Sequence, residues 1–132
     1  MLGKSEAFSG FSVDDIGIAK KFYGETLGLE VTDEPSGLAL HMPGSRPIFV
    51  YPKPNHEPAT FTILNFPVDD IDAAVDELTS LGVTFERYDG MEGIQQDEKG
   101  IARPENPDWG PPIAWFKDPA GNVLSVLEGS PE

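Results

Sequence analysis

The sequence predicts an α+β chain in which one βαβββ unit occurs twice in tandem. The hexapeptide Phe-Ser-Val-Asp-Asp-Ile at residues 11–16 recurs at residues 66–71 as Phe-Pro-Val-Asp-Asp-Ile, with five of six residues identical. Each copy is followed by apolar residues at helical spacing and then by short apolar runs between turn residues. Self-similarity at a fixed period identifies an architecture directly. We expect a single domain over residues 1–132, with units at 7–52 and 60–128.

Each repeat lies at a junction between a strand and a helix. The apolar run at residues 7–13 predicts the first strand, and Asp14 is expected to cap the following helix, as Asp69 does in the second copy. Gly28 and Gly82 are placed to adopt the left-handed conformation that ends each helix. The helical stripes consist of Ile16, Ala19, Phe22, Tyr23 and Leu27 in the first copy, and of Ile71, Ala74, Val75, Leu78 and Leu81 in the second.

Short apolar runs after each helix predict three strands per half. They cover residues 29–33, 38–42 and 47–51 in the first half, and residues 84–88, 113–117 and 123–128 in the second. Residues 118–122, Asp-Pro-Ala-Gly-Asn, predict a tight hairpin turn between the last two strands. The polar segment 89–112 is too long for a routine connection, and it fits either a binding lid or a disordered loop.

Composition restricts the classes of function. The net charge of −14, from 23 acidic and 9 basic residues, disfavours nucleic acid as a partner, because nucleic-acid affinity depends on basic groups. No apolar run approaches the ~20 residues of a membrane helix, and the start lacks the apolar stretch of a signal peptide. We therefore expect a cytoplasmic protein without membrane contact. The acidity fits either attraction of a cationic ligand or a solvated surface.

The motifs, taken together and in order, resemble the vicinal oxygen chelate superfamily of glyoxalases, bleomycin-resistance proteins and extradiol dioxygenases. The resemblance covers nearly the whole chain and implies two curved half-barrel sheets around a cleft. It also implies a homodimer, with barrels formed within one chain or across two. The matching elements are the junctions Val13–Ile16 and Val68–Ile71, Phe22-Tyr23 followed by Leu27-Gly28-Leu29, and the closing hairpin Trp115–Asn122.

Catalytic members of this family hold a metal with four inward side chains, usually His and Glu. The resemblance transfers those positions onto Phe8, Phe49, Ile63 and Ser125. Phe and Ile have no lone pair, and one serine cannot hold a divalent metal. We therefore expect no metal, no cofactor and no catalytic residue of the usual kind. A different metal site from His41, His56 and nearby acids is the alternative, but neither spacing nor strand parity brings these residues together.

Strand parity predicts which side chains line the cleft that the resemblance implies. Side chains alternate across a strand, so a cleft-facing Phe8 places Ser12 on the same side and turns Phe11 and Val13 toward the helix. Trp109 fits either a lid over a ligand or a cap on a core edge. The alternative is a closed cavity, with the apolar members packed as core. The predicted ligand-binding residues are Phe8, Ser12, His41, Phe49, Tyr51, Ile63, Asn65, Trp109, Trp115, Ser125 and Leu127.

Three functions remain open from the sequence. The first is a metal-independent protein of the bleomycin-resistance type that sequesters an aromatic or amphipathic compound. The second is an enzyme, either a glyoxalase-like lyase or dioxygenase relative with unusual ligands, or a metal-free isomerase or cyclase relying on Tyr51, His41 or Glu128. The third is an interaction module with a closed cavity. Arg46 and Arg103 fit either clamps for an anion or solvated surface, and spacing places no nucleophile beside either histidine.

Overall fold

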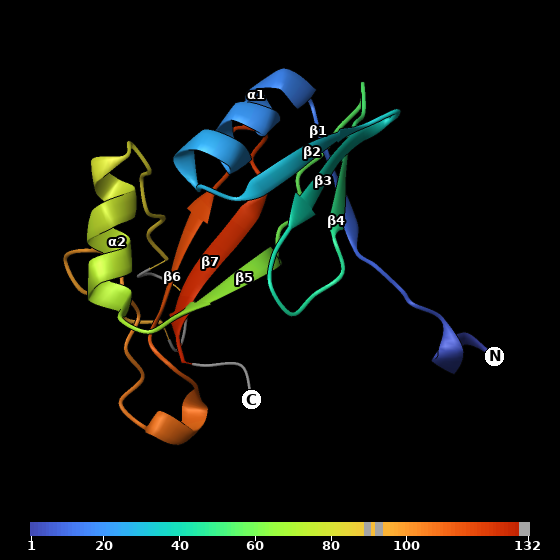
Figure 1. The fold of residues 1–132 in the computed structure, drawn as a ribbon. Helices are drawn as coiled ribbons and strands as arrows, with labels where there is room; N and C mark the ends of the chain where they lie inside the picture. Colours follow the sequence, from blue (N-terminus) through green and yellow to red (C-terminus); the bar gives the residue numbers. More distant parts are fainter. Residues whose placement is uncertain (89–90, 92–93, 130–132) are drawn as a thin grey trace. The chain divides into compact units, whose positions relative to one another are not determined.

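The computed structural model describes residues 1–88, 91 and 94–129. The chain divides into two compact units, Met1–Pro58 and Ala59–Glu132, called unit 1 and unit 2 below. Unit 1 begins with a short 3-10 turn, η1 (Leu2–Lys4), which lies away from its sheet (Figure 1). None of the helices in the described ranges has the length and hydropathy that a membrane span requires.

Unit 1 is a four-stranded sheet with one helix on one face (Figure 1). The strand order is β1-β4-β3-β2, with β1 parallel to β4 and the other neighbours antiparallel. The elements are β1 (Gly10–Val13), α1 (Ile16–Lys21), a π-helical turn η2 (Phe22–Thr26), β2 (Glu30–Glu34), β3 (Gly37–His41) and β4 (Ile48–Pro52).

The core of unit 1 lies between the sheet and α1. Val13, Leu40 and Val50 are fully buried on the face of the sheet toward the helix, and Tyr23 is buried opposite them. The Phe11 ring lies 5.8 Å from the Tyr23 ring, so the parity predicted for β1 holds. The other face of the sheet carries no helix of unit 1, and we call it the helix-free face.

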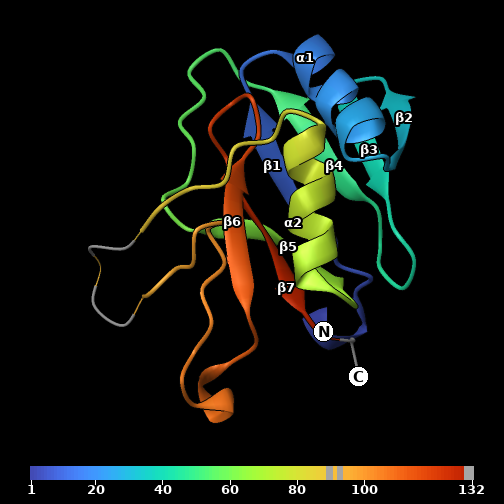
Figure 2. The same ribbon diagram turned by 90° about the vertical axis from the view of Figure 1, so that its left-hand side faces the viewer.

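Unit 2 repeats this plan with three strands in the order β5-β7-β6 (Figure 2). Its first and last strands are parallel, as in unit 1. Ile71 and Val75 of the helix and Phe116 and Leu124 of the sheet are almost completely buried. The elements are β5 (Thr62–Val68), α2 (Ile71–Ser80), a 3-10 turn η3 (Pro107–Trp109), β6 (Ile113–Lys117) and β7 (Val123–Glu128).

Helix capping follows the duplicated motif, but it uses the second acid of each pair. The Asp15 carboxylate accepts a hydrogen bond from the Ile18 N–H, and Asp70 accepts one from the Ala73 N–H. The prediction of Asp14 and Asp69 was therefore wrong by one residue, because each of these aspartates forms a bend between the end of the strand and the N-cap of the helix. Gly28 and Gly82 end the helical segments with φ of 74° and 97°, as predicted.

Two predicted strands differ from the structure by more than one residue at an end. Residues 84–88 form no strand, and only Phe85 makes an isolated bridge, to Phe116. The first strand begins at Gly10, so Phe8 precedes it. In the predicted lid segment 89–112, Ala102 bridges to Gln96 and to Ile113, while residues 89–90 and 92–93 lie outside the described residues. Residues 94–112 thus contain these bridges and the turn η3, and the choice between a lid and a disordered loop stays a prediction.

Candidate functional site

The helix-free face of unit 1 gathers four of the predicted ligand-binding residues. The parallel register pairs Gly10 with Phe49 and Ser12 with Tyr51, and the antiparallel register pairs Phe49 with Ala39. Because side chains alternate, Ser12, Phe49, Tyr51 and His41 all lie on this face. The Phe49 and Tyr51 rings are stacked, with centroids 5.8 Å apart and planes 20° from parallel. Tyr51 is 37% exposed, so the pair presents aromatic surface.

A hollow of about 320 Å³ lies next to this pair, and we call it the Phe8 hollow. Phe8 is 67% exposed, so it is a rim residue and not part of the core. Arg46 is ion-paired with Glu6. The prediction that the apolar members pack together as core therefore does not describe Phe8. The hollow is lined by Phe8, Glu34, Ala39, Arg46, Pro47, Ile48 and Phe49.

Both histidines contact a hydroxyl group. The Ser12 Oγ lies 2.7 Å from the His56 Nδ1, and the Thr32 Oγ1 lies 2.9 Å from the His41 Nε2. Motif spacing placed no nucleophile beside either histidine, and only the structure shows the Ser12 hydroxyl beside His56. The contact joins residues 44 positions apart, so motif spacing carries no signal for it. A hydroxyl in hydrogen-bond contact with an imidazole can give up its proton to the ring.

The helix-free face of unit 2, which is the face of its sheet opposite α2, gathers a second set of predicted residues. The register pairs Ser125 with Asn65 on one side and with Trp115 on the other. The buried Ser125 hydroxyl donates a hydrogen bond to the Asn65 Oδ1 at 2.5 Å. The Trp115 ring packs edge-on against Tyr88, and burial, with a contribution from Glu86, raises the pKa of Tyr88. Ile63 lies at the irregularity in the β5 register, and Leu127 pairs with Pro67.

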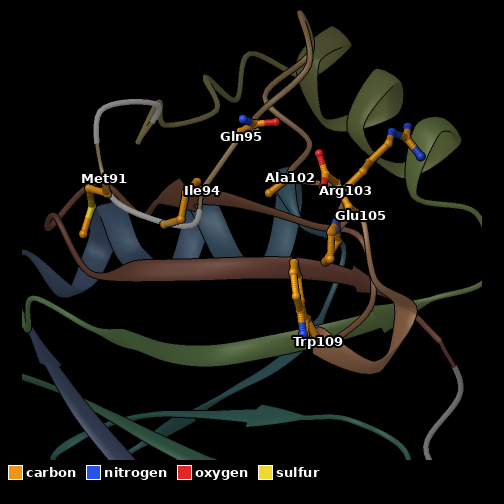
Figure 3. A pocket seen from close by; sticks show the side chains of 8 residues that line it. Met91, Ile94, Gln95, Ala102, Arg103, Glu105 and Trp109 are labelled. Carbon is orange, nitrogen blue, oxygen red and sulfur yellow. The ribbon is translucent and has the colours of Figure 1, made fainter.

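The described part of the long segment forms a second hollow, of about 420 Å³, which we call the Trp109 hollow (Figure 3). Trp109 is 72% exposed, so it does not cap a core edge. Figure 3 shows Arg103 reaching toward α2, while Ile94 and Trp109 border the hollow. The lining residues are Met91, Ile94, Gln95, Ala102, Arg103, Pro104, Glu105 and Trp109.

An ion network holds one wall of the Trp109 hollow. The Arg103 guanidinium donates two hydrogen bonds of 2.9 Å to the Asp72 carboxylate and one of 3.3 Å to Asp97. Lys99 joins the network through Asp72 and Asp76. The Arg103 hydrogen bond holds the pKa of Asp72 below its usual value. Desolvation acts against Asp97, but backbone N–H donors and Arg103 outweigh it and lower the pKa of that carboxyl group too.

The four positions of the family's metal ligands do not fit a metal. Phe8 and Phe49 line the Phe8 hollow with carbon atoms, Ile63 offers no donor, and the Ser125 hydroxyl is hydrogen-bonded to Asn65. Within the ranges 1–88, 91 and 94–129, no three His, Cys, Asp or Glu side chains gather closely enough to hold a metal ion.

Sequence reasoning missed most of the walls of both hollows. Ala39 is signalled only by its register with Phe49. Glu34 lies at the end of a strand, and Gln95 and Glu105 lie in a segment without periodicity, so no pattern pointed to them. Of the two arginines that the sequence offered as anion clamps, Arg46 and Arg103, each is ion-paired with carboxylates of this chain.

Comparison with known proteins places the chain in a family. No curated protein sequence matches it. The solved structures of similar fold include a glyoxalase family protein from Enterococcus faecalis (22% identity, 97% of this chain and 100% of that one, TM-score 0.67). TnmS3, an antibiotic binding protein from Streptomyces sp. CB03234, is 24% identical over 96% of this chain and 98% of its own, with a TM-score of 0.63.

A third similar structure is the fosfomycin resistance protein FosX from Listeria monocytogenes, which is 13% identical over 94% of this chain and 92% of its own, with a TM-score of 0.66. At these identities the likeness concerns the fold. The sequence model of one family matches residues 8–126, which is most of the chain. The chain therefore belongs to the Glyoxalase/Bleomycin resistance protein/Dioxygenase superfamily.

Proposed function

We propose that this chain is a metal-independent small-molecule binding protein that takes an aromatic or amphipathic compound. The observation that carries the proposal is the stacked pair Phe49 and Tyr51 on the helix-free face of unit 1, where Phe49 also lines the Phe8 hollow. Apolar walls with few polar groups are usual in small-molecule sites. Burial of a flat ring there contributes free energy at ~25 cal/mol per Å² of apolar area.

Two further observations support this proposal. The side chains at the family's metal positions lack suitable donor atoms, which favours binding without a metal. TnmS3, whose fold is similar, is an antibiotic binding protein, and this favours a small organic ligand. Pairing of two chains, which the family resemblance implies, is part of the proposal, and sedimentation velocity tests it.

A thermal-shift screen against aromatic antibiotics and metabolites tests the proposal. A ligand at a hundred times its Kd stabilises the folded state by ~2.7 kcal/mol and raises the melting temperature by several degrees. Calorimetric titration of each hit then gives Kd for the wild type and for the Phe8→Ala and Phe49→Ala variants. We expect each substitution to weaken binding about tenfold or more, since an aromatic contact is worth ~1 kcal/mol beyond its buried area.

Phe61→Ala is the matched control. Phe61 is 68% exposed, almost the same as Phe8, and it lines neither hollow. Its removal should leave Kd unchanged. A panel without any stabilising compound, or Phe8 and Phe49 variants that bind as tightly as the Phe61 control, would contradict the proposal.

A metal-free enzyme is the second candidate, and the Ser12 to His56 contact of 2.7 Å favours it. The imidazole could act as a base toward the hydroxyl or toward a substrate on the same face. Of the other groups considered from the sequence, the Glu128 carboxylate accepts a hydrogen bond from the Ile71 N–H at 3.1 Å and so serves α2. Turnover of esters or enolisable carbonyl compounds that disappears in His56→Gln would support an enzyme, and equal residual turnover would refute it.

A further inference from the structure

The two hollows share one pattern of charge. Each contains one arginine, and in each the charge of that arginine is met by carboxylates of the chain itself. Arg46 is ion-paired with Glu6 in unit 1, and Arg103 is bound to both Asp72 and Asp97 in unit 2. Neither guanidinium is therefore available as a strong anchor for an anionic ligand, because a second carboxylate would have to displace one already bound.

Each hollow also contains one glutamate whose negative charge is not neutralised by a neighbouring cation. Among the described residues, the carboxylates of Glu34 and Glu105 have neither an ion-pair nor a hydrogen-bond partner. Both residues are exposed and line their hollows. The Phe8 hollow and the Trp109 hollow therefore each combine aromatic surface with an uncompensated negative charge.

We infer that the ligand is an organic cation with an aromatic or apolar body, and that Glu34 and Glu105 act as its counter-charges. This inference rests on the proposed function and narrows its ligand class. The ring body contacts Phe8 and Phe49 in unit 1 or Trp109 in unit 2, where a cation over the indole face is also attracted by the ring itself. The net charge of −14 also attracts a cationic ligand at longer range.

The expected size of the effect is moderate, because both glutamates face water. An exposed ion pair contributes ~0.2–1 kcal/mol and an exposed cation–π contact ~0.5–1 kcal/mol, so together they change Kd by roughly three- to thirtyfold, of which the ion pair alone gives up to about fivefold. Screening by salt reduces this difference, since the Debye length falls from ~8 Å at physiological ionic strength to ~3 Å at 1 M. Apolar contacts with the ring remain at high salt.

A charge series on one ring system tests the inference. N-methylacridinium, acridine and acridine-9-carboxylate are titrated calorimetrically at about pH 8, where they are cationic, neutral and anionic, against the wild type and the Glu34→Gln and Glu105→Gln variants. Glu57→Gln in unit 1 and Glu77→Gln in unit 2 are the controls, because each removes one exposed negative charge from the same unit without touching either hollow. All four substitutions change the net charge equally.

We expect affinity to fall from the cation to the neutral ring to the anion. At least one of Glu34→Gln and Glu105→Gln should weaken the cation roughly two- to fivefold, leave acridine unchanged, and lose its effect at 1 M salt. Equal binding of cation and neutral ring, or loss no greater than in the controls, would overturn the inference while leaving aromatic binding intact. Failure of all three probes to bind would overturn both it and the proposed aromatic site.

Discussion

Unit 1 carries a full four-stranded sheet, whereas in the described part of unit 2 only isolated bridges at Phe85 and Ala102 pair with the outer edge of β6. In unit 1 a short turn joins β2 to β3, and the two strands pair along their whole length. In unit 2 the chain instead leaves the sheet for a long segment, whose residues 97–103 are tied to α2 by Arg103 and Lys99. In unit 1 strand pairing thus completes the sheet, whereas in unit 2 side-chain ion pairs hold residues 97–103 against α2.

The difference shows which parts of a duplicated unit tolerate change. Both copies retain the strand–helix junction with an aspartate cap and a closing glycine. The aspartate accepts a hydrogen bond from an N–H group in the first turn of the helix, and the glycine adopts the left-handed conformation that ends the helix. The outer strand contacts only one neighbour in the sheet, so replacing it removes fewer contacts. The Trp109 hollow lies on the long segment that unit 1 lacks, whereas the Phe8 hollow lies around β3 and β4, which have counterparts in unit 2.

The largest expected effect concerns the close packing of Gly37 in β3 against the backbone of β4 in unit 1. A Cβ at Gly37 would lie 2.1 Å from the Val50 carbonyl oxygen, which belongs to the backbone of β4. Gly37→Ala should therefore lower the free energy of unfolding by about 3 kcal/mol or more, measured by urea denaturation. Gly17→Ala in α1 meets only an ordinary contact and should be neutral or slightly stabilising. A loss below 1 kcal/mol for Gly37→Ala would show that this packing is not tight.

The next prediction tests whether residues 97–103, which Arg103 and Lys99 hold against α2, contribute to the core of unit 2. Ile101 is completely buried, so Ile101→Ala should lower the free energy of unfolding by about 2–5 kcal/mol. Ile18→Ala is the matched control, because Ile18 is 52% exposed on α1 and should lose much less. Equal small losses in both variants would mean that residues 97–103 contribute no core to unit 2.

A smaller effect concerns what the two units share. Asp15→Ala and Asp70→Ala should each lower the free energy of unfolding by about 1 kcal/mol, because each removes the side-chain acceptor of an N-terminal helix N–H. Asp14→Ala and Asp69→Ala, one residue earlier, should change it by less than about 0.5 kcal/mol. Chemical denaturation of the four variants gives the comparison, and the reverse order would return the caps to the first acid of each pair.

The smallest effect is a dependence on pH that arises in unit 2. The pKa values of Asp72 and Asp97 are lowered in the folded state, so both groups stabilise the fold above the unfolded pKa of about 4. That stabilisation is lost as the pH falls from about 4 through the lower folded pKa values. Arg103→Met should therefore flatten the decline of the melting temperature between pH 5 and 2.5. Lys20→Met, which removes an exposed ion pair of unit 1, should leave the slope unchanged, and parallel curves for wild type and Arg103→Met would refute the prediction.

Elements with a strong local signal were predicted closely from the sequence. The last two strands coincide with the predicted residues 113–117 and 123–128, because short apolar runs and the turn at Gly121 mark them clearly. The run at 84–88 carries a similar local pattern, yet it forms only the Phe85 bridge. Local pattern shows that a segment suits a strand, but pairing depends on a partner that lies elsewhere in the chain.

The candidate site was predicted only in part, because the sequence shows strand parity but not the contacts that loops make. Parity along each strand placed Ser12, Phe49 and Tyr51 on one face, and the register agrees. Parity cannot show that Arg46 pairs with Glu6, or that a hollow opens beside Phe8. Those features depend on the loops, where no regular period relates sequence position to direction.

The sequence by itself determined the duplicated strand–helix framework, the glycines that end the helices and the lack of metal donors at the positions that the family resemblance transfers, because these depend on neighbouring residues or on residue type alone. Only the tertiary structure decided that Ser12 meets His56, that Asp72 meets Arg103, and that Glu34 and Glu105 line hollows without a partner among the described residues. Such contacts join residues far apart along the chain. Their distances are set by strand register and loop packing, which minimise the free energy of the fold as a whole.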